Sequence, residues 1–172
     1  MPAGYLSSTE KRGEATVIDL LSPQLQAQGL FPAGRLDRDS VGLLVLTNDG
    51  DFAHKVMSPR HKVDKVYEIS YAGVLDIHAP ERFRQGIEID GGEVCESASL
   101  SLLGDNRALV TIHEGRYHQV KRMIAAVGGE VTFLRRISIG ALRLDPALAE
   151  GEVRELSPEE CFALLGKAGE GQ

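Results

Sequence analysis

The sequence predicts an α+β fold with a mixed, largely antiparallel sheet and flanking helices. Segments with the apolar or alternating pattern of strands outnumber the helical patterns, and the two kinds do not alternate regularly along the chain, which is typical of this fold class. The 172 residues, 42% of them hydrophobic, are enough for one compact domain with its own core, arranged in one or two lobes.

The N-terminal third begins with a short helix and a buried strand. Residues 16–21 show a short helical pattern of apolar side chains. The apolar run 43–46 is bounded by the turn residues 47–50, which is typical of a buried strand. A helix is expected over 51–57, because its apolar residues share one face, and Pro59 ends it.

The rest of the chain contains no internal repeat. Residues 65–71 alternate, which predicts a strand with Lys65, Tyr67, Ile69 and Tyr71 on one face. A capping box at Ser157-Pro158-Glu159-Glu160 starts a final helix that is expected to end near Gly166. Between them we expect a helix at 80–86, strands near 87–89 and 94–103, a strand at 108–112, a helix at about 117–126 with Gly128-Gly129 as its stop, and strands at 131–134 and 137–144.

The net charge of −6 argues against a simple RNA-coating protein, but the charge is unevenly distributed. Segments 73–105 and 145–172 each carry −5, which leaves +4 for the rest of the chain. The basic segment 54–65 contains Arg60 and Lys62, which are candidate phosphate contacts, although solvated surface charges are the alternative. A second basic set consists of Arg116, Lys121, Arg122, Arg135 and Arg136.

Nothing in the sequence points to a membrane or to secretion. No apolar stretch approaches the ~20 residues that a membrane-spanning helix needs. The N-terminus lacks the basic and apolar parts of a signal peptide. Cys95 and Cys161 are far apart and in no metal-binding spacing, so we expect reduced thiols in a cytoplasmic protein, and a single disulfide remains the alternative.

Asp37 is the candidate functional acid. It lies in the glycine-containing segment 34–42, directly before the predicted buried strand, and loops that are held by a rigid strand are common places for catalytic groups. The alternative is a structural aspartate that caps a turn or pairs with Arg35 or Arg38. These residues alone favour the structural alternative.

Several ordered motifs change that balance. They are Pro2-Ala3-Gly4-Tyr5-Leu6-Ser7-Ser8-Thr9, Gly34-Arg35-Leu36-Asp37, Lys65-Val66-Tyr67, Glu114-Gly115-Arg116-Tyr117-His118-Gln119-Val120-Lys121-Arg122-Met123, Leu144-Asp145, and Gly151-Glu152-Val153-Arg154-Glu155-Leu156. Together they resemble the catalytic domain of the RsuA-type pseudouridine synthases along nearly the whole chain. The resemblance implies the same α+β sheet with helices around it and a central catalytic cleft.

The resemblance also implies a chemistry. Such an enzyme cuts the N-glycosidic bond of a uridine, turns the base, and rejoins it to the sugar through C5, which needs no cofactor. The family's motif assigns the catalytic carboxylate to Asp37 and a uracil-packing role, with a share in removing the C5 proton, to Tyr67. Without the motif, Tyr67 reads as a core tyrosine of a sheet.

The remaining site residues follow from the third motif and from the loop. Alignment on His118-Gln119 gives Lys121 as the cation that pairs with Asp37, and Arg122 points about 100° away on a helix, which fits a phosphate contact better. Arg35 is expected near the extruded nucleotide, and Arg116 and His118 at phosphate or ribose.

The expected substrate is a uridine of ribosomal RNA, free or in a ribosomal particle. Small-subunit 16S RNA is preferred over large-subunit RNA, and the enzyme is expected to be a monomer. RsuA-type enzymes usually carry an S4-like RNA-binding domain before the catalytic domain, and we expect these residues to be the catalytic domain without it.

Two other function classes remain. A non-catalytic RNA-binding module is disfavoured, because binding alone needs no buried carboxylate. A metal-dependent hydrolase that uses Asp37 with Asp39, or Asp49 with Asp51, is disfavoured because these pairs form no organised ligand set, and Asp49 and Asp51 look like turn and cap residues.

Overall fold

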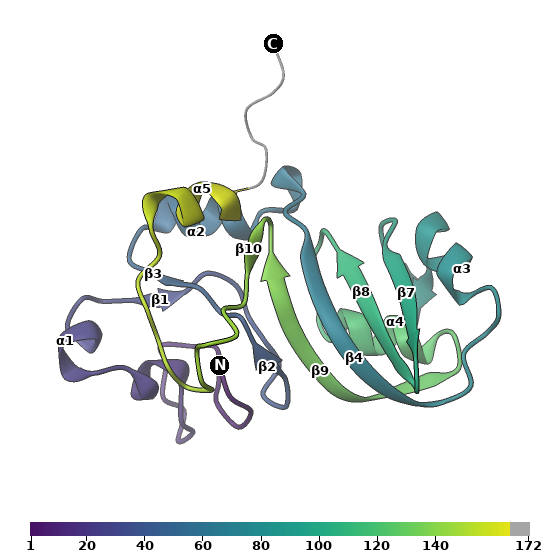
Figure 1. Cartoon of the computed structure of the whole chain (residues 1–172), viewed down its shortest axis with the longest axis horizontal. Coiled ribbons are helices and arrows are strands. Elements are labelled where there is room, and N and C mark those ends of the chain that lie inside the picture. The colour runs from purple at the N-terminus through teal and green to yellow at the C-terminus, as the bar shows by residue number, and fades with distance from the viewer. Residues whose placement is uncertain (166–172) are drawn as a thin grey trace, which may run out of the picture.

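The computed structural model describes residues 1–165, and it confirms the α+β class (Figure 1). The central sheet has the strand order β10-β9-β4-β8-β7, and a sixth strand, β2, also pairs with β9 outside this order. Only the β2–β9 pairing is parallel in this sheet, so it is mixed and largely antiparallel, as expected. The strands are β2 (Val41–Gly42), β4 (Lys65–Gly73), β7 (Ser99–Gly104), β8 (Arg107–Ile112), β9 (Gly129–Ile139) and β10 (Leu142–Arg143).

Two small two-stranded sheets accompany the central one. They pair β1 (Phe31–Pro32) with β3 (Leu46–Thr47) and β5 (Glu88–Ile89) with β6 (Glu93–Val94), both antiparallel. The helices are the 3-10 helices η1 (Val17–Leu20) and η2 (Pro59–His61), and the α-helices α1 (Pro23–Gln26), α2 (Gly50–Met57), α3 (Ala79–Gln85), α4 (Gln119–Ala125) and α5 (Pro158–Leu164). Within residues 1–165 no helix is long and apolar enough to cross a membrane.

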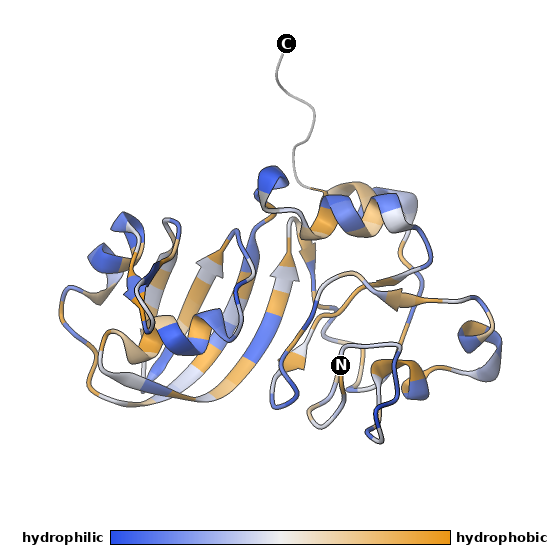
Figure 2. Cartoon of the chain, turned by 180° about the vertical axis from the view of Figure 1, so that it is seen from behind, coloured by the Kyte–Doolittle hydropathy of each residue, from blue (hydrophilic) through white to orange (hydrophobic). Residues whose placement is uncertain are grey.

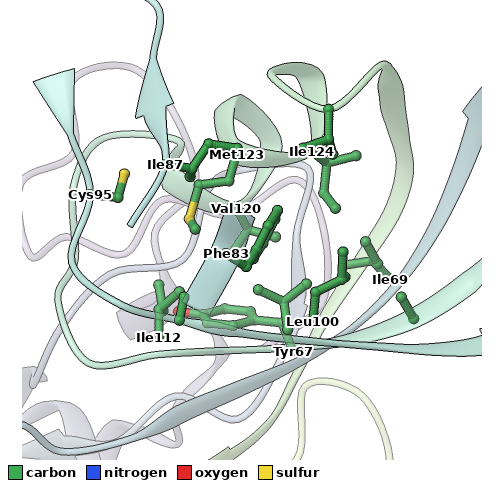
Figure 3. Close-up of a cluster of buried hydrophobic side chains, with 14 of the residues drawn as sticks. Tyr67, Ile69, Phe83, Ile87, Cys95, Leu100, Ile112, Val120, Met123 and Ile124 are labelled. Carbon is green, nitrogen blue, oxygen red and sulfur yellow. The ribbon is translucent and has the colours of Figure 1, made fainter. Parts of the chain in front are cut away.

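The hydrophobic core lies on one face of the central sheet, under α3 and α4. Ile69 of β4 packs there with Phe83 of α3 and with Met123 and Ile124 of α4, all of them fully buried (Figure 3). Hydrophobic and hydrophilic residues alternate along the strands because successive side chains point to opposite faces (Figure 2). A second cluster packs α2 and α5 against β10 and includes Ala53, Val56, Leu142 and Leu164.

The predicted strand at 43–46 is wrong in this form. The apolar run connects two sheets: β2 (Val41–Gly42) ends before it, and only its last residue, Leu46, belongs to a strand, β3 (Leu46–Thr47). Between them the Leu43 N–H donates to the Arg136 carbonyl (2.8 Å), and the Val45 carbonyl accepts from the Ala33 N–H (2.8 Å). The chain crosses from one sheet to the other here, so its backbone changes partner within three residues.

The two strands predicted at 131–134 and 137–144 are also corrected. They form one strand, β9, which a turn at Gly140-Ala141 joins to the short β10. The pair Arg135-Arg136 looks like an interruption in the sequence, but it lies inside the strand. The segment predicted as one strand near 94–103 is instead divided into β6 and β7.

The helical predictions at 51–57, 80–86 and 117–126 are confirmed as α2, α3 and α4, with ends shifted by a few residues. Of the segment predicted as helical at 16–21, Val17–Leu20 form the 3-10 helix η1, with Thr16 as its N-cap. The capping box at Ser157 is present and starts α5. The predicted end of that helix at Gly166 lies outside the described residues.

Candidate active site

A cavity of about 540 Å³ lies between the loop that precedes β2, the start of β4 and the start of α4. This volume is within the usual range of small-molecule sites. The loop contributes Arg35 and Asp37, β4 contributes Lys65 and Tyr67, and β9 contributes Arg136. The segment before α4 and its first turns contribute Arg116, Tyr117, His118, Gln119 and Lys121.

The loop around Asp37 is held by hydrogen bonds on both sides. The Ser40 N–H donates to the Asp37 carbonyl (2.9 Å), and the Gly4 N–H donates to the Arg38 carbonyl (2.7 Å). The hydroxyl of Ser7 accepts from the Leu36 N–H at 2.9 Å. The Asp37 side chain keeps 28% of its surface exposed, so a fixed backbone presents an accessible carboxylate to the cavity.

Lys121 lies between two carboxylates of this loop. Its Nζ is 3.1 Å from Oδ2 of Asp37 and 2.6 Å from Oδ1 of Asp39. The hydrogen bond from Lys121 lowers the pKa of Asp39, with burial acting against it. Burial acts to lower the pKa of Lys121, but the hydrogen bonds to Asp39 and Asp37 outweigh it and raise that pKa. The ammonium group of Lys121 therefore occupies the position between Asp37 and Asp39 that a metal ion would take in the hydrolase alternative.

Arg122 lies on the other side of α4 and does not reach Asp37. Its Nη1 is 3.0 Å from a carboxylate oxygen of Glu93, its Nε pairs with Asp90, and its Nη2 donates to the Asp90 carbonyl at 2.8 Å. The helix thus separates the two neighbouring cations as the 100° rotation requires. Protein oxygens already surround the guanidinium of Arg122. A contact between Arg122 and an RNA phosphate stays a prediction.

Tyr67 belongs both to the core and to the cavity wall. It is 8% exposed, packs in the core cluster with Ile69 and Ile112, and also lines the cavity (Figure 3). Cζ of Arg136 lies 6.0 Å from the centre of its ring. The structural and the functional interpretation of Tyr67 are therefore compatible.

His118 and Arg116 line the cavity as expected for ligand contacts. Nε2 of His118 is 3.6 Å from Oδ1 of Asp37, and its ring stacks on Tyr117 with 3.8 Å between the ring centres. The backbone of His118 is left-handed (φ 49°), which turns the chain into α4. Nε of Arg116 is 2.9 Å from Glu114, and that hydrogen bond raises the pKa of Arg116.

Arg35 also lines the cavity, with an exposed side chain. Arg60 and Lys62 do not: they lie in and just after η2, on the surface. Nζ of Lys62 is 3.8 Å from a carboxylate oxygen of Glu96. The structure thus brings seven of the nine predicted site residues to the cavity or to the helix that borders it, and these two lie apart from it.

The alternative aspartate pair, Asp49 and Asp51, has a structural role at α2. Oδ1 of Asp49 accepts from the Asp51 N–H (2.9 Å) and the Phe52 N–H (3.0 Å), which is an N-cap. Within residues 1–165 no group of three or more His, Cys, Asp or Glu side chains could hold a metal ion.

Arg136 lines the cavity, but sequence reasoning placed it only in a general basic set. It is 1% exposed and is the largest of the fully buried side chains. A period-two reading of the whole segment would have found it, because Leu134, Arg136 and Ser138 all point to the buried face of β9.

The comparisons with known proteins agree with this geometry. Residues 2–126 match the family model described as RNA pseudouridylate synthase. An uncharacterized RNA pseudouridine synthase of Bacillus subtilis is 44% identical over 167 residues, which are 95% of this chain and 70% of the relative. The ribosomal small subunit pseudouridine synthase A of Vibrio cholerae is 43% identical over 164 residues, 95% of this chain and 71% of the relative.

A solved structure supports the same assignment. The crystal structure of a pseudouridylate synthase matches with a TM-score of 0.88 and 38% identity, over 95% of this chain and 70% of that chain. The fold class and the enzyme class expected from the sequence are confirmed. With a family match over most of its length and relatives above 40% identity along nearly all of it, this chain belongs to the RNA pseudouridylate synthase family.

Proposed function

We propose that this enzyme converts a specific uridine of ribosomal RNA into pseudouridine, with small-subunit RNA as its substrate. The single observation that carries the chemistry is the ion pair between Lys121 and Asp37 at the wall of the cavity. The choice of the small subunit rests on the sequence relatives that are ribosomal small subunit pseudouridine synthases. Large-subunit RNA is the alternative target.

The reaction needs one ionised carboxylate and a place to keep a detached base. The ammonium group of Lys121, 3.1 Å from Oδ2 of Asp37, is proposed to supply the counter-charge of that carboxylate and to hold it in position. Bonds are exchanged within one nucleotide without net oxidation, so the reaction itself requires no redox partner.

Tyr67 is proposed to pack against the uracil ring. Its position in the cavity wall, where it is 8% exposed, gives the base the edge of an aromatic surface, and the phenol hydroxyl can donate or accept a proton. A stacked uridine has to leave its helix to reach this place, and Arg35, exposed beside the cavity, is proposed to fill the space near the extruded nucleotide.

The test is pseudouridine formation on defined RNA. Small-subunit and large-subunit ribosomal transcripts, and ribosomal particles, are incubated with the protein, and pseudouridine is mapped at nucleotide resolution with and without a chelator. Asp37→Asn is the control, because it is nearly isosteric and removes the ionised oxygen. We expect modification of one small-subunit site by the wild type and none by the variant.

Each of the other outcomes selects a different function for this protein. Modification of large-subunit RNA selects the alternative target. Binding without modification by the wild type selects a non-catalytic RNA-binding module. Activity of the Asp37→Asn variant above a few per cent removes Asp37 as the catalytic acid. The monomeric state and the cytoplasmic location expected from the sequence stay predictions, and sedimentation with and without RNA tests the first.

A further inference from the structure

The basic side chains that line the cavity differ in how their charge is balanced. Lys121 and Arg116 each lie within 4.0 Å of carboxylate oxygens. In the part of the chain that the structure describes, Lys65 and Arg136 have no carboxylate oxygen within that distance of their charged nitrogens. Arg35 has none either, but its side chain is exposed to solvent. One side of the cavity therefore carries positive charge that the protein does not neutralise.

Arg136 is the most buried of these cations. Its Nε donates to the Leu43 carbonyl (2.8 Å) and its Nη1 to the Arg35 carbonyl (3.3 Å). These two carbonyls flank the loop that carries Asp37, so the guanidinium fixes both ends of that loop to β9.

The third nitrogen of Arg136, Nη2, is buried without a hydrogen-bond partner. Within residues 1–165 the only other buried side-chain atom of this kind is Oγ of Ser40, and both residues line the cavity. A buried cation without a counter-charge destabilises a fold, which calls for a functional reason.

Lys65 is half-buried and lines the same cavity. It lies two residues before Tyr67 on β4, and its Nζ donates to the Val63 carbonyl at 3.3 Å. Burial lowers the pKa of Lys65 and the charge of Arg136 lowers it further, while the charge of Asp64 acts in the opposite direction without reversing the shift. Two cations that repel each other in a poorly solvated place favour the arrival of an anion.

The proposed reaction produces such an anion. When the bond between N1 of uracil and C1′ of ribose breaks, the bonding electron pair stays on the base and spreads over its carbonyl oxygens. If Asp37 instead adds to C6 of the base, the electron pair of the C5–C6 double bond moves toward O4. Either route places negative charge on a carbonyl oxygen of uracil. The charge is removed when C5 bonds to C1′ and any bond to the Asp37 carboxylate breaks. C5 then gives up its proton and N1 takes one up, so that the product is neutral.

We propose that Lys65 and Arg136 stabilise this negative charge on the uracil ring while the base is detached. Lys65, which is accessible, makes the direct contact with a carbonyl oxygen. Arg136, which is covered and lies 6.0 Å from the centre of the Tyr67 ring, acts through its charge and by holding the loop. Fixed charges aimed at a developing anion are among the strongest catalytic devices. The inference rests on the proposed function.

The test compares two rings of similar size at one neutral pH. Uracil is neutral there, whereas barbiturate is planar and carries a negative charge spread over its carbonyl oxygens. Binding of both is measured by calorimetry for the wild type, Lys65→Met and Arg136→Met. Arg143→Met is the control, because Arg143 is an exposed arginine on β10 that does not line the cavity.

We expect the wild type and Arg143→Met to bind barbiturate about tenfold or more tightly than uracil, the strength of one hydrogen bond to a charged group. In Lys65→Met the ratio should fall to about one, and Lys65→Arg should restore part of it. A wild type that does not prefer barbiturate, or does not bind it, overturns the proposal, as does an unchanged ratio in Lys65→Met.

Arg136→Met also removes the loop contacts, so Arg136→Lys, which keeps the charge, is measured beside it. If both variants at position 136 fail to fold, the Lys65 series decides alone. The binding ratio needs no turnover: a wild type that prefers barbiturate but makes no pseudouridine contradicts the proposed function and leaves the anion site standing. A wild type that makes pseudouridine without the preference contradicts the anion site only.

Discussion

The ammonium nitrogen of Lys121 lies 3.1 Å from Oδ2 of Asp37, while the guanidinium of the next residue in the helix lies against Asp90 and Glu93. One helix thus supplies the counter-charge of Asp37, the proposed catalytic residue, from one face and ion pairs with Asp90 and Glu93 from another. The two cations are adjacent in sequence but separated in space. Replacing one side chain at a time therefore distinguishes an effect on the reaction rate from an effect on the stability of the fold.

Lys121→Met should lower the single-turnover rate of pseudouridine formation by about 100-fold or more, because it leaves two carboxylates next to each other without a cation. Arg122→Met should change that rate little and should lower the melting temperature, because Asp90 and Glu93 lose their common partner. Rates on a defined transcript and thermal unfolding by circular dichroism measure both effects. The reverse pattern would show that the wrong cation has been assigned to Asp37.

The stability that the Lys121 bridge contributes should depend on pH at both ends of the range. The pKa of Asp39 is lowered from its ordinary 3.8, so its contribution is present above pH 3.8 and is lost as the pH falls through the lowered value. The pKa of Lys121 is raised from its ordinary 10.5, so its contribution is present below pH 10.5 and is lost as the pH rises through the raised value.

The difference in melting temperature between the wild type and Lys121→Met checks this. It should be nearly constant around neutral pH and should shrink in strong acid. It should also be small and sensitive to salt, because the Asp39 side chain is 74% exposed. A difference that grows as the pH falls below 3.8 would contradict the assignment of Asp39 as a partner.

Tyr67→Phe and Tyr67→Leu separate two roles of this tyrosine. The first variant keeps the ring and removes the hydroxyl, whereas the second removes both. If Tyr67 transfers a proton, both variants should lose most of their turnover. If it only packs against the base, Tyr67→Phe should retain most of it. Full activity of Tyr67→Leu, measured at equal folded fraction, would return Tyr67 to a purely structural role.

RNA affinity should decrease with salt through the basic surface near η2. With four to six phosphate contacts to unpaired RNA, the slope of log affinity against log salt should be about −3 to −4. Arg60→Glu with Lys62→Glu should flatten this slope, as filter binding at several salt concentrations can show. The same double change should leave the rate at saturating RNA unaltered, since neither side chain lines the cavity. If the RNA affinity and its salt dependence are the same in the double variant as in the wild type, the RNA binds to another part of the surface.

The sequence predicts the helices well and several strands poorly, for a physical reason. Helices such as α2 and α5 carry their own signals, Asp49 and the Ser157 capping box, within a few residues. A strand is defined by its partner, and the run 43–46 changes partner in its middle, which no local pattern records.

The candidate site shows the same limit. Asp37, Tyr67 and Lys121 were found because their motifs could be read along the chain. Lys65 was noted in the motif Lys65-Val66-Tyr67, in the basic segment 54–65 and on the strand face that it shares with Tyr67, but it was not assigned to the site. Arg136 was overlooked as a site residue because the segment was divided into two strands at Arg135-Arg136, which hid the period-two pattern that Arg136 shares with Leu134 and Ser138. Its burial depends on carbonyl groups of the loop at positions 35 and 43, which are distant in sequence.

The parallel pairing of β2 with β9 also affects how the chain folds while it is being synthesised. Arg136 and the Leu43 carbonyl that it binds are 93 positions apart, and sequence separation of this kind delays the formation of native contacts. A chain emerging from the ribosome can form the contacts of this loop with Gly4 and Ser7 early, but it lacks the contacts with Arg136 until residues 129–139 have been released. The loop that carries Asp37 therefore gains its complete set of contacts only when synthesis has passed β9.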